Sequence, residues 1–342
     1  MECGTDNDRP AKVDAGLRRR QTISHCPHPR RASLIPRVVV AALCSLWTVQ
    51  AIAQELTPRA YWPSPKGTKV AVFGYSHVEG DVLFDPSIPL YGVDSNIRTG
   101  ILAYLQTFSL AGRTTNVVIE LPYSWGTTQG LVGETPGRRD FSAFNDLGLT
   151  LSVNLLGAPT MTPPEFQALR ADPHLILGAT LKIHPPTGQY DNDRLINVGT
   201  NRWATKIELG SVIPLRPKWL LELSAGSWFF TDDDDFLVGK REQEPIHAFQ
   251  FHLVHRFKPG FWVSLDANYF TGGRQTIGGN ELVDVQHNSR VGAMVAVPFR
   301  GRHAIKLGYF IGVRTEYGSD FDQFLLSYQV LLNKGPQKPR NP

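Results

Sequence analysis

The strongest constraint on this fold is a repeated two-residue periodicity of apolar side chains. Between residues 69 and 332 the sequence contains twelve segments, each about ten residues long, in which apolar residues occupy every second position. Residues 147–155, for example, read LGLTLSVNL. Successive side chains of a β-strand point to opposite faces. Each segment therefore predicts a strand with one apolar face and one polar face.

Twelve such strands predict a closed membrane barrel. Lipid offers no water to exposed backbone groups, so a membrane-spanning sheet has to close on itself. Single-chain bacterial barrels have an even number of antiparallel strands whose apolar faces contact lipid. We therefore expect an all-β protein, a twelve-stranded antiparallel transmembrane β-barrel of the bacterial outer-membrane type.

Aromatic residues lie near the ends of the expected strands, among them Trp203, Trp219, Trp228 and Trp262. We interpret them as the aromatic belts that barrels place at the two membrane interfaces. A soluble β-sandwich is the alternative, because the same rings would then fill an ordinary core.

Short and long connections alternate along the chain. The short ones are rich in glycine, proline and basic residues, and lie at 111–113, 214–218, 258–260 and 300–302. The expected outer loops, mostly longer, lie at 80–97, 126–143, 184–202, 231–245, 271–288 and 315–320. Barrels have short periplasmic turns and longer extracellular loops, so both termini are expected in the periplasm. The connection 157–174 is long for the periplasmic side, and we expect a short helix at 164–170.

The N-terminal region is predicted to direct export. Basic residues precede an apolar stretch of 16 residues that ends in Ala51-Ile52-Ala53, which is typical of a secretory signal and short of the roughly 20 residues of a spanning helix. Lipid attachment at Cys44 is disfavoured, because Leu43 before it is a poor lipobox residue. The expected organisation is a basic extension plus signal peptide at 1–53, removed on export, a periplasmic segment at 54–67, the barrel at 68–332 and a polar tail at 333–342.

Cysteine and charge agree with this division of the chain. All three cysteines lie in the leader, so the mature chain suits an oxidising compartment. The leader also holds eight Lys/Arg and four Asp/Glu, which accounts for the whole net charge of +4. No basic patch remains that would indicate nucleic-acid binding. We expect the mature protein in the bacterial outer membrane, after export through the inner membrane.

The polar faces of the expected strands carry ionisable residues of both signs. Buried charges are costly unless they are paired or solvated, so these side chains either line a polar path or form a salt-bridged filling. Both interpretations remain open at this stage. The residues expected to line the lumen are Glu120, Lys182, Lys206, Glu208, Glu222, Asp266, Arg290 and Lys306.

Several blocks in the second half of the chain resemble an outer-membrane family labelled "putative meta-pathway of phenol degradation". They read GQYDNDRLINVGTNRW at 188–203, WFFTDDDD at 228–235, REQEP at 241–245, YFTGGR at 269–274 and NSRVG at 288–292. The resemblance implies an outer-membrane channel, associated by name with aromatic catabolism. The chain departs from the usual barrel pattern after Leu332, because a polar extension follows instead of a terminal aromatic residue.

Residues that would carry other chemistry have simpler interpretations. The run Asp232–Asp235 offers carboxylates to a divalent cation, but it lacks spaced ligands and is expected to be a solvated outer loop. His247 and His255 fall on the predicted lipid face near opposite rims, and no segment has a catalytic signature. We therefore expect no metal, no cofactor and no enzymatic activity.

The sequence thus favours a passive channel for small solutes, with aromatic or hydrophobic compounds as candidates. A closed structural or surface-interaction barrel is the alternative, and an outer-membrane hydrolase is a weaker one. The expected partners are outer-membrane lipid and lipopolysaccharide, a small-molecule solute and the outer-membrane assembly machinery.

Overall fold

The computed structural model describes residues 49–50, 58–82, 90–132, 135–192, 194, 196–236, 239–314, 316–317 and 320–333. The leader predicted at 1–53 lies outside the described residues except for β1 (Val49–Gln50), which pairs with the strand beginning at Gln286. Most of the predicted C-terminal tail lies outside them as well. Both predictions therefore stay predictions.

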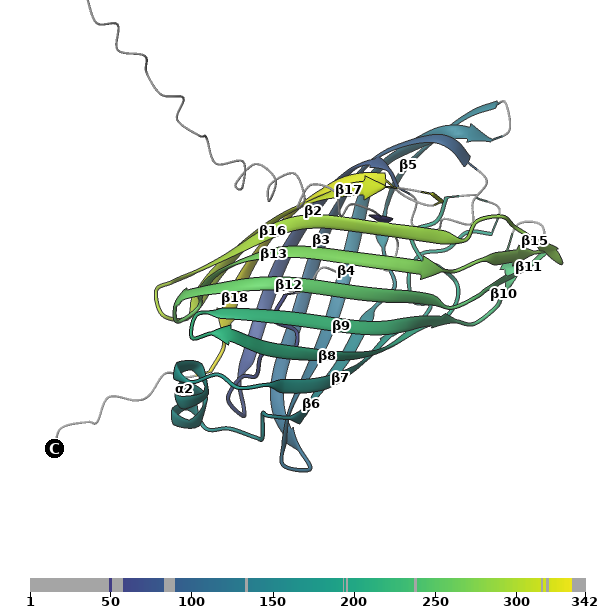
Figure 1. Ribbon diagram of the computed structural model, residues 1–342. Coiled ribbons are helices and arrows are strands. Elements are labelled where there is room, and N and C mark those ends of the chain that lie inside the picture. The colour runs from purple at the N-terminus through teal and green to yellow at the C-terminus, as the bar shows by residue number, and fades with distance from the viewer. Residues whose placement is uncertain are drawn as a thin grey trace, which may run out of the picture. The chain divides into compact units, whose positions relative to one another are not determined.

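Twelve antiparallel strands form a closed ring (Figure 1). Strands that follow each other around the ring are hydrogen-bonded, and the last pairs with the first through Leu331 and Val70. This confirms the predicted fold. The ring strands are β2 (Lys69–Asp81), β3 (Leu90–Leu110), β4 (Arg113–Val132), β6 (Gly148–Leu156), β7 (Ile176–His184), β8 (Ala204–Arg216), β9 (Trp219–Phe230), β12 (Ile246–Lys258), β13 (Phe261–Gly272), β16 (Gln286–Phe299), β17 (His303–Arg314) and β18 (Asp320–Leu331).

The predicted short connections are tight turns gathered at one end of the barrel, called here the turn end. Ala111 and Gly112 join β3 to β4 with φ of 48° and 75°, as a type I′ hairpin turn requires. Pro259 and Gly260 join β12 to β13, with φ of 78° at Gly260, the positive value that a Pro-Gly turn needs at its second position. Local sequence thus dictates these turns.

Burial is inverted relative to a soluble protein. The side chains of Leu209 and Leu265 are each 61% exposed, whereas Lys206 and Arg290 are 2% and 0% exposed. Water would penalise such a surface, because large exposed apolar patches are rare on soluble monomers, whereas lipid matches it. The apolar face therefore points outward, and the sandwich alternative is excluded. None of the helices in the described ranges is long and apolar enough to cross a bilayer.

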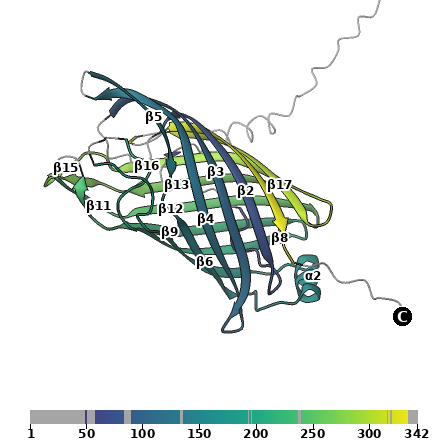
Figure 2. The same cartoon turned by 180° about the vertical axis from the view of Figure 1, so that it is seen from behind.

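The opposite end, called here the loop end, has more regular structure than the sequence predicted. β3 and β4 are 21 and 20 residues long, about twice the span a tilted strand needs. β5 (Thr135–Phe144) pairs with the projecting part of β4 (Figure 2). A separate sheet contains β10 (Asp233–Phe236), β11 (Gly239–Gln243), β14 (Gln275–Ile277) and β15 (Asn280–Glu281). The described parts of the predicted loops at 80–97 and 126–143 are therefore largely strand. Apolar residues stabilise them, because Ile97, Phe141 and Ala143 form a buried cluster with Val198.

A short helix, α2 (Pro163–Ala171), interrupts the long connection at the turn end, as predicted. The Glu165 carboxylate accepts hydrogen bonds of 2.7 Å from both the backbone nitrogen and the hydroxyl of Thr162, a capping arrangement that starts the helix. The Thr162 hydroxyl lowers the pKa of Glu165. Leu169 and Phe166 attach the helix to an apolar cluster inside the barrel.

The predicted aromatic belt is only partly correct. Trp203 and Trp219 are exposed on the outer surface. Trp228 and Trp262 are buried among interior residues, and so were assigned to the wrong face. Each of these two tryptophans is next in sequence to an apolar residue of the outer face, Phe229 or Val263, so strand alternation turns its ring inward. Two phenylalanines near strand ends, Phe270 and Phe321, are buried in the same way.

Candidate functional site

The segment before the first barrel strand contacts the inner wall at the turn end. Lys66 donates a backbone hydrogen bond to Met161, and Gly67 donates one to Thr107, both at 2.8 Å. Tyr61 and Trp62 are 3% and 7% exposed and belong to the interior apolar cluster. The sequence pattern predicted only a periplasmic segment at 54–67 and no contact of this kind.

Two glycines create the space for the Tyr61 ring. Gly178 and Gly210 pair across β7 and β8, and a Cβ added to either would lie 2.3 Å and 2.0 Å, respectively, from a ring carbon of Tyr61. Asn154 donates a hydrogen bond of 3.1 Å to the Tyr61 carbonyl. Any side chain larger than glycine would therefore displace the ring.

The Glu208 carboxylate accepts hydrogen bonds from several side chains, including the hydroxyl of this tyrosine. Its Oε1 accepts a bond of 2.9 Å from the Tyr61 hydroxyl, and its Oε2 accepts one of 2.9 Å from Gln250. The Lys206 ammonium lies 2.5 Å from Oε2. Each donor offsets part of the cost of keeping the carboxylate away from bulk water.

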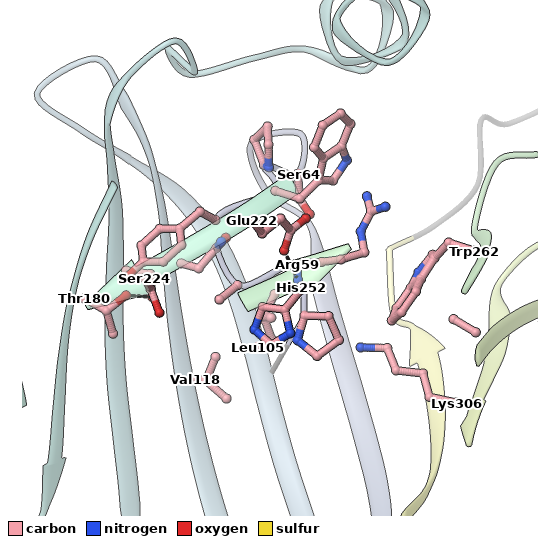
Figure 3. A pocket seen from close by; sticks show the side chains of 18 of the residues that line it. Arg59, Ser64, Leu105, Val118, Thr180, Glu222, Ser224, His252, Trp262 and Lys306 are labelled. Carbon is pink, nitrogen blue, oxygen red and sulfur yellow. Dashed lines mark hydrogen bonds between the residues drawn. The ribbon is translucent and has the colours of Figure 1, made fainter. Parts of the chain in front are cut away.

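A second set of polar groups surrounds Arg59. The Arg59 backbone nitrogen donates a hydrogen bond to Oε2 of Glu222. Its guanidinium carbon lies 4.8 Å from the ring centroid of Trp62 and 5.6 Å from that of Trp262. The Lys306 ammonium nitrogen lies 5.7 Å from the Trp262 centroid (Figure 3). Cations at these distances from an indole face interact favourably with it.

These groups line a lumenal cavity of about 430 Å³. Its wall includes six of the eight residues predicted to line the lumen, namely Glu120, Lys182, Lys206, Glu208, Glu222 and Lys306. Lys182 lies 3.4 Å from Glu120. The cavity wall therefore carries two ion pairs together with Glu222 and Lys306.

The other two predicted residues lie elsewhere in the interior. Asp266 is buried and accepts bonds of 2.7 Å from His252 and 2.9 Å from Ser264. Because Ser264 donates to the carboxylate and not to the imidazole, this trio differs from a nucleophile–base arrangement. Arg290 lies nearer the loop end, where it donates to Gln323 at 3.1 Å, and its guanidinium carbon is 4.1 Å from the Phe321 ring.

A wider cavity of about 1080 Å³ opens at the turn end beside α2. Its charged lining residues are Arg170, Lys218, Arg256, Lys258 and Arg302, without a carboxylate among the described lining residues. Arg256 joins the two cavities, since it lines both and stacks at 4.8 Å over Trp62.

At the loop end, residues 184–203 and the small sheet pack together. Asp146 accepts bonds of 2.8–2.9 Å from the backbone of Thr187, Gly188 and Thr200 and from the Thr200 hydroxyl. Val198 packs against Ile97 of β3. The loop thus contacts a strand well separated from its own two neighbours in the ring.

The aspartate run at 232–235 was predicted to be a solvated loop, and this prediction is only partly correct. Asp233 and Arg241 are completely buried and form an ion pair of 3.0 Å. Asn201 and Tyr190 donate to the same carboxylate. Burial lowers the pKa of Arg241 to about 10. Within the described ranges, no cluster of three or more His, Cys, Asp or Glu side chains could hold a metal ion.

The residues missed by the sequence reasoning are Arg59, Tyr61, Trp62 and Trp262. A signal for the first three existed, because Arg-Ala-Tyr-Trp at 59–62 lies shortly before the first strand and two strands carry glycines on their polar faces. The Tyr61 ring fits only where Gly178 and Gly210 become neighbours across two strands. Periodicity alone does not predict the strand register that brings them together.

Ring closure, an apolar outer surface and a charged interior define a β-barrel of the bacterial outer-membrane type, and this confirms the predicted localisation. The family model described as "Putative MetA-pathway of phenol degradation" matches residues 81–328, so the chain belongs to that family. The predicted resemblance is therefore confirmed. No curated protein matches the chain.

Solved structures support the same fold. The crystal structure of the COG4313 outer membrane channel from Pseudomonas putida F1 is 22% identical with a TM-score of 0.66, and the match covers 81% of this chain and 100% of that one. More distant are the β domain of the Bordetella autotransporter BrkA (12% identity, TM-score 0.47, 78% and 100% coverage) and the P. putida toluene transporter TodX (8%, 0.40, 80% and 92%). These two carry no further argument.

Proposed function

We propose that the protein is an outer-membrane channel through which small solutes move passively, with aromatic or hydrophobic compounds among them. The main support is the lumenal cavity of about 430 Å³ whose wall carries ionisable side chains. Cavities of about 300–1,000 Å³ suit small organic molecules.

The proposed direction of movement is down a concentration gradient. The sequence contains no phosphate-binding loop motif that would couple transport to a nucleotide. The aromatic solute class rests on the family description, which refers to phenol degradation. The aromatic wall of the cavity, which includes Trp62 and Trp262, supports the same class.

A closed structural barrel is the second candidate, because chain segments pack at both ends of the lumen. Tyr61, Trp62 and α2 occupy the turn end, and residues 184–203 pack over the loop end. In this alternative the interior charges only fill the barrel, and the loop end acts as a surface for other molecules.

Liposome swelling separates the two candidates. Vesicles containing the purified barrel should swell in arabinose faster than vesicles without protein, because this sugar crosses lipid slowly and the proposed path would admit it. The matched control is the Ser152→Trp variant, whose bulky side chain would fill part of the cavity that Ser152 lines. Equal swelling rates in all three preparations would favour the closed barrel.

We further propose that residues 1–53 are removed on export and that the assembly machinery inserts the mature chain among outer-membrane lipid and lipopolysaccharide. Mass spectrometry of the protein isolated from outer membranes should give a mature N-terminus at Gln54. An N-terminus upstream of residue 38 would contradict the proposed cleavage.

A further inference from the structure

Two cations lie beside Trp262 in the lumenal cavity. Arg59 and Lys306 lie on this ring, at 5.6 Å and 5.7 Å from its centroid. Among the described residues, neither charged group donates a hydrogen bond to a carboxylate or a carbonyl; the Arg59 bond to Glu222 comes from its backbone nitrogen. Figure 3 shows Arg59 and Lys306 close to Trp262 within the cavity.

The acids around the cavity do not balance these cations. Glu120 pairs with Lys182, and Glu208 pairs with Lys206. Glu222 is the remaining carboxylate of the lining, and it interacts electrostatically with both Arg59 and Lys306. This part of the cavity therefore has excess positive charge, in surroundings where charges are screened less than in water.

The approach from the turn end has the same sign. The charged groups of the wider cavity are all basic, and Arg170, Arg256 and Lys258 line both cavities. Cationic clefts with low-dielectric walls concentrate anions and accelerate their entry. The two cavities together form a continuous series of basic side chains that leads to Trp262.

We propose that Arg59 and Lys306 form a binding subsite for the carboxylate of a small aromatic or hydrophobic carboxylic acid. A guanidinium matches a carboxylate with two parallel donors, and the ammonium adds a point charge. The indole rings of Trp62 and Trp262 then contact the apolar body of the ligand. This inference rests on the proposed function and specifies the solute class.

The test compares benzoate with benzyl alcohol, which has the same ring without the charge. Calorimetric titration of the detergent-solubilised barrel should give about tenfold tighter binding of benzoate, the size of effect that a charge-assisted hydrogen bond supplies. Lys306→Gln should abolish the difference, whereas Lys306→Arg should retain it. Lys240→Gln, which removes an exposed cation at the loop end, is the matched control and should also retain it.

The outcomes separate the two ideas. Equal affinities in the wild-type barrel, or a preference that survives Lys306→Gln in a correctly folded variant, would overturn the carboxylate subsite. Folding is checked by circular dichroism during heating. Benzoate entry into liposomes is measured in parallel. Selective binding of benzoate without its entry would contradict the proposed transport and support the subsite. Equal entry of both compounds without selective binding would support transport and contradict the subsite.

Discussion

The phenolic hydroxyl of Tyr61 donates a hydrogen bond of 2.9 Å to Glu208, 147 residues further along the chain. This contact joins the segment before the first strand to the inner wall of β8. The ring lies against Gly178 and Gly210, which leave it just enough room. The size of the lumenal path therefore depends on whether this segment stays in place.

Gly210→Ala should displace Tyr61 and widen the lumen. The added Cβ would lie 2.0 Å from a ring carbon, so the ring has to move. We expect a several-fold rise in single-channel conductance in planar bilayers. Gly100→Ala is the matched control, because its Cβ would meet Trp125 at an ordinary 3.6 Å. Unchanged conductance in Gly210→Ala would mean that the segment does not limit the path.

Adjacent residues on β6 should respond oppositely to arginine. Leu151 belongs to the apolar outer face, whereas Ser152 is buried, bonds to Thr180 and lines the cavity. Leu151→Arg places a cation in lipid, at a cost of about 2–4 kcal/mol at the mid-plane, and should block assembly. Ser152→Arg should assemble and shift ion selectivity toward anions. Assembly is read from the yield of folded barrel in the outer membrane, and similar losses in both variants would contradict the assignment of faces.

Arg241→Met should loosen the loop end. Removing one partner of a buried ion pair leaves Asp233 uncompensated, which costs about 3–5 kcal/mol. We expect faster proteolysis of residues 184–203, because Thr200 also accepts a hydrogen bond from Arg241. Lys240→Met removes an exposed cation next to it and should leave the rate unchanged. Equal protection of the loop in both variants would show that the pair does not hold it.

The barrel itself was predictable because lipid imposes a simple rule. Strand number, closure and turn positions follow from period-two alternation and from turn residues such as Pro259 and Gly260. The rule acts only where one face meets lipid. It therefore gave no strand at the projecting parts of β3 and β4, where apolar residues such as Ile97 are buried against other segments of the loop end. It also gave the wrong face for Trp228 and Trp262, whose rings face inward.

The candidate site was predictable only in part, for a related reason. Alternation placed Lys206, Glu208 and Lys306 on the polar face, and the structure brings them to one cavity. It gave no information on residues outside the strands. Arg59 and Tyr61 enter the site through contacts between distant segments, and those contacts depend on the shape of the wall around Gly178 and Gly210.

The most direct test of the lumenal path is chemical modification during current recording. The mature chain is predicted to lack cysteine, so Thr180→Cys and Leu181→Cys each introduce a single thiol, the first on the cavity wall and the second on the outer face, 37% exposed. A membrane-impermeant, charged thiol reagent should lower the current through Thr180→Cys and leave that through Leu181→Cys unchanged. No current in either barrel, or a current that modification at Thr180→Cys does not alter, would contradict a path through this cavity.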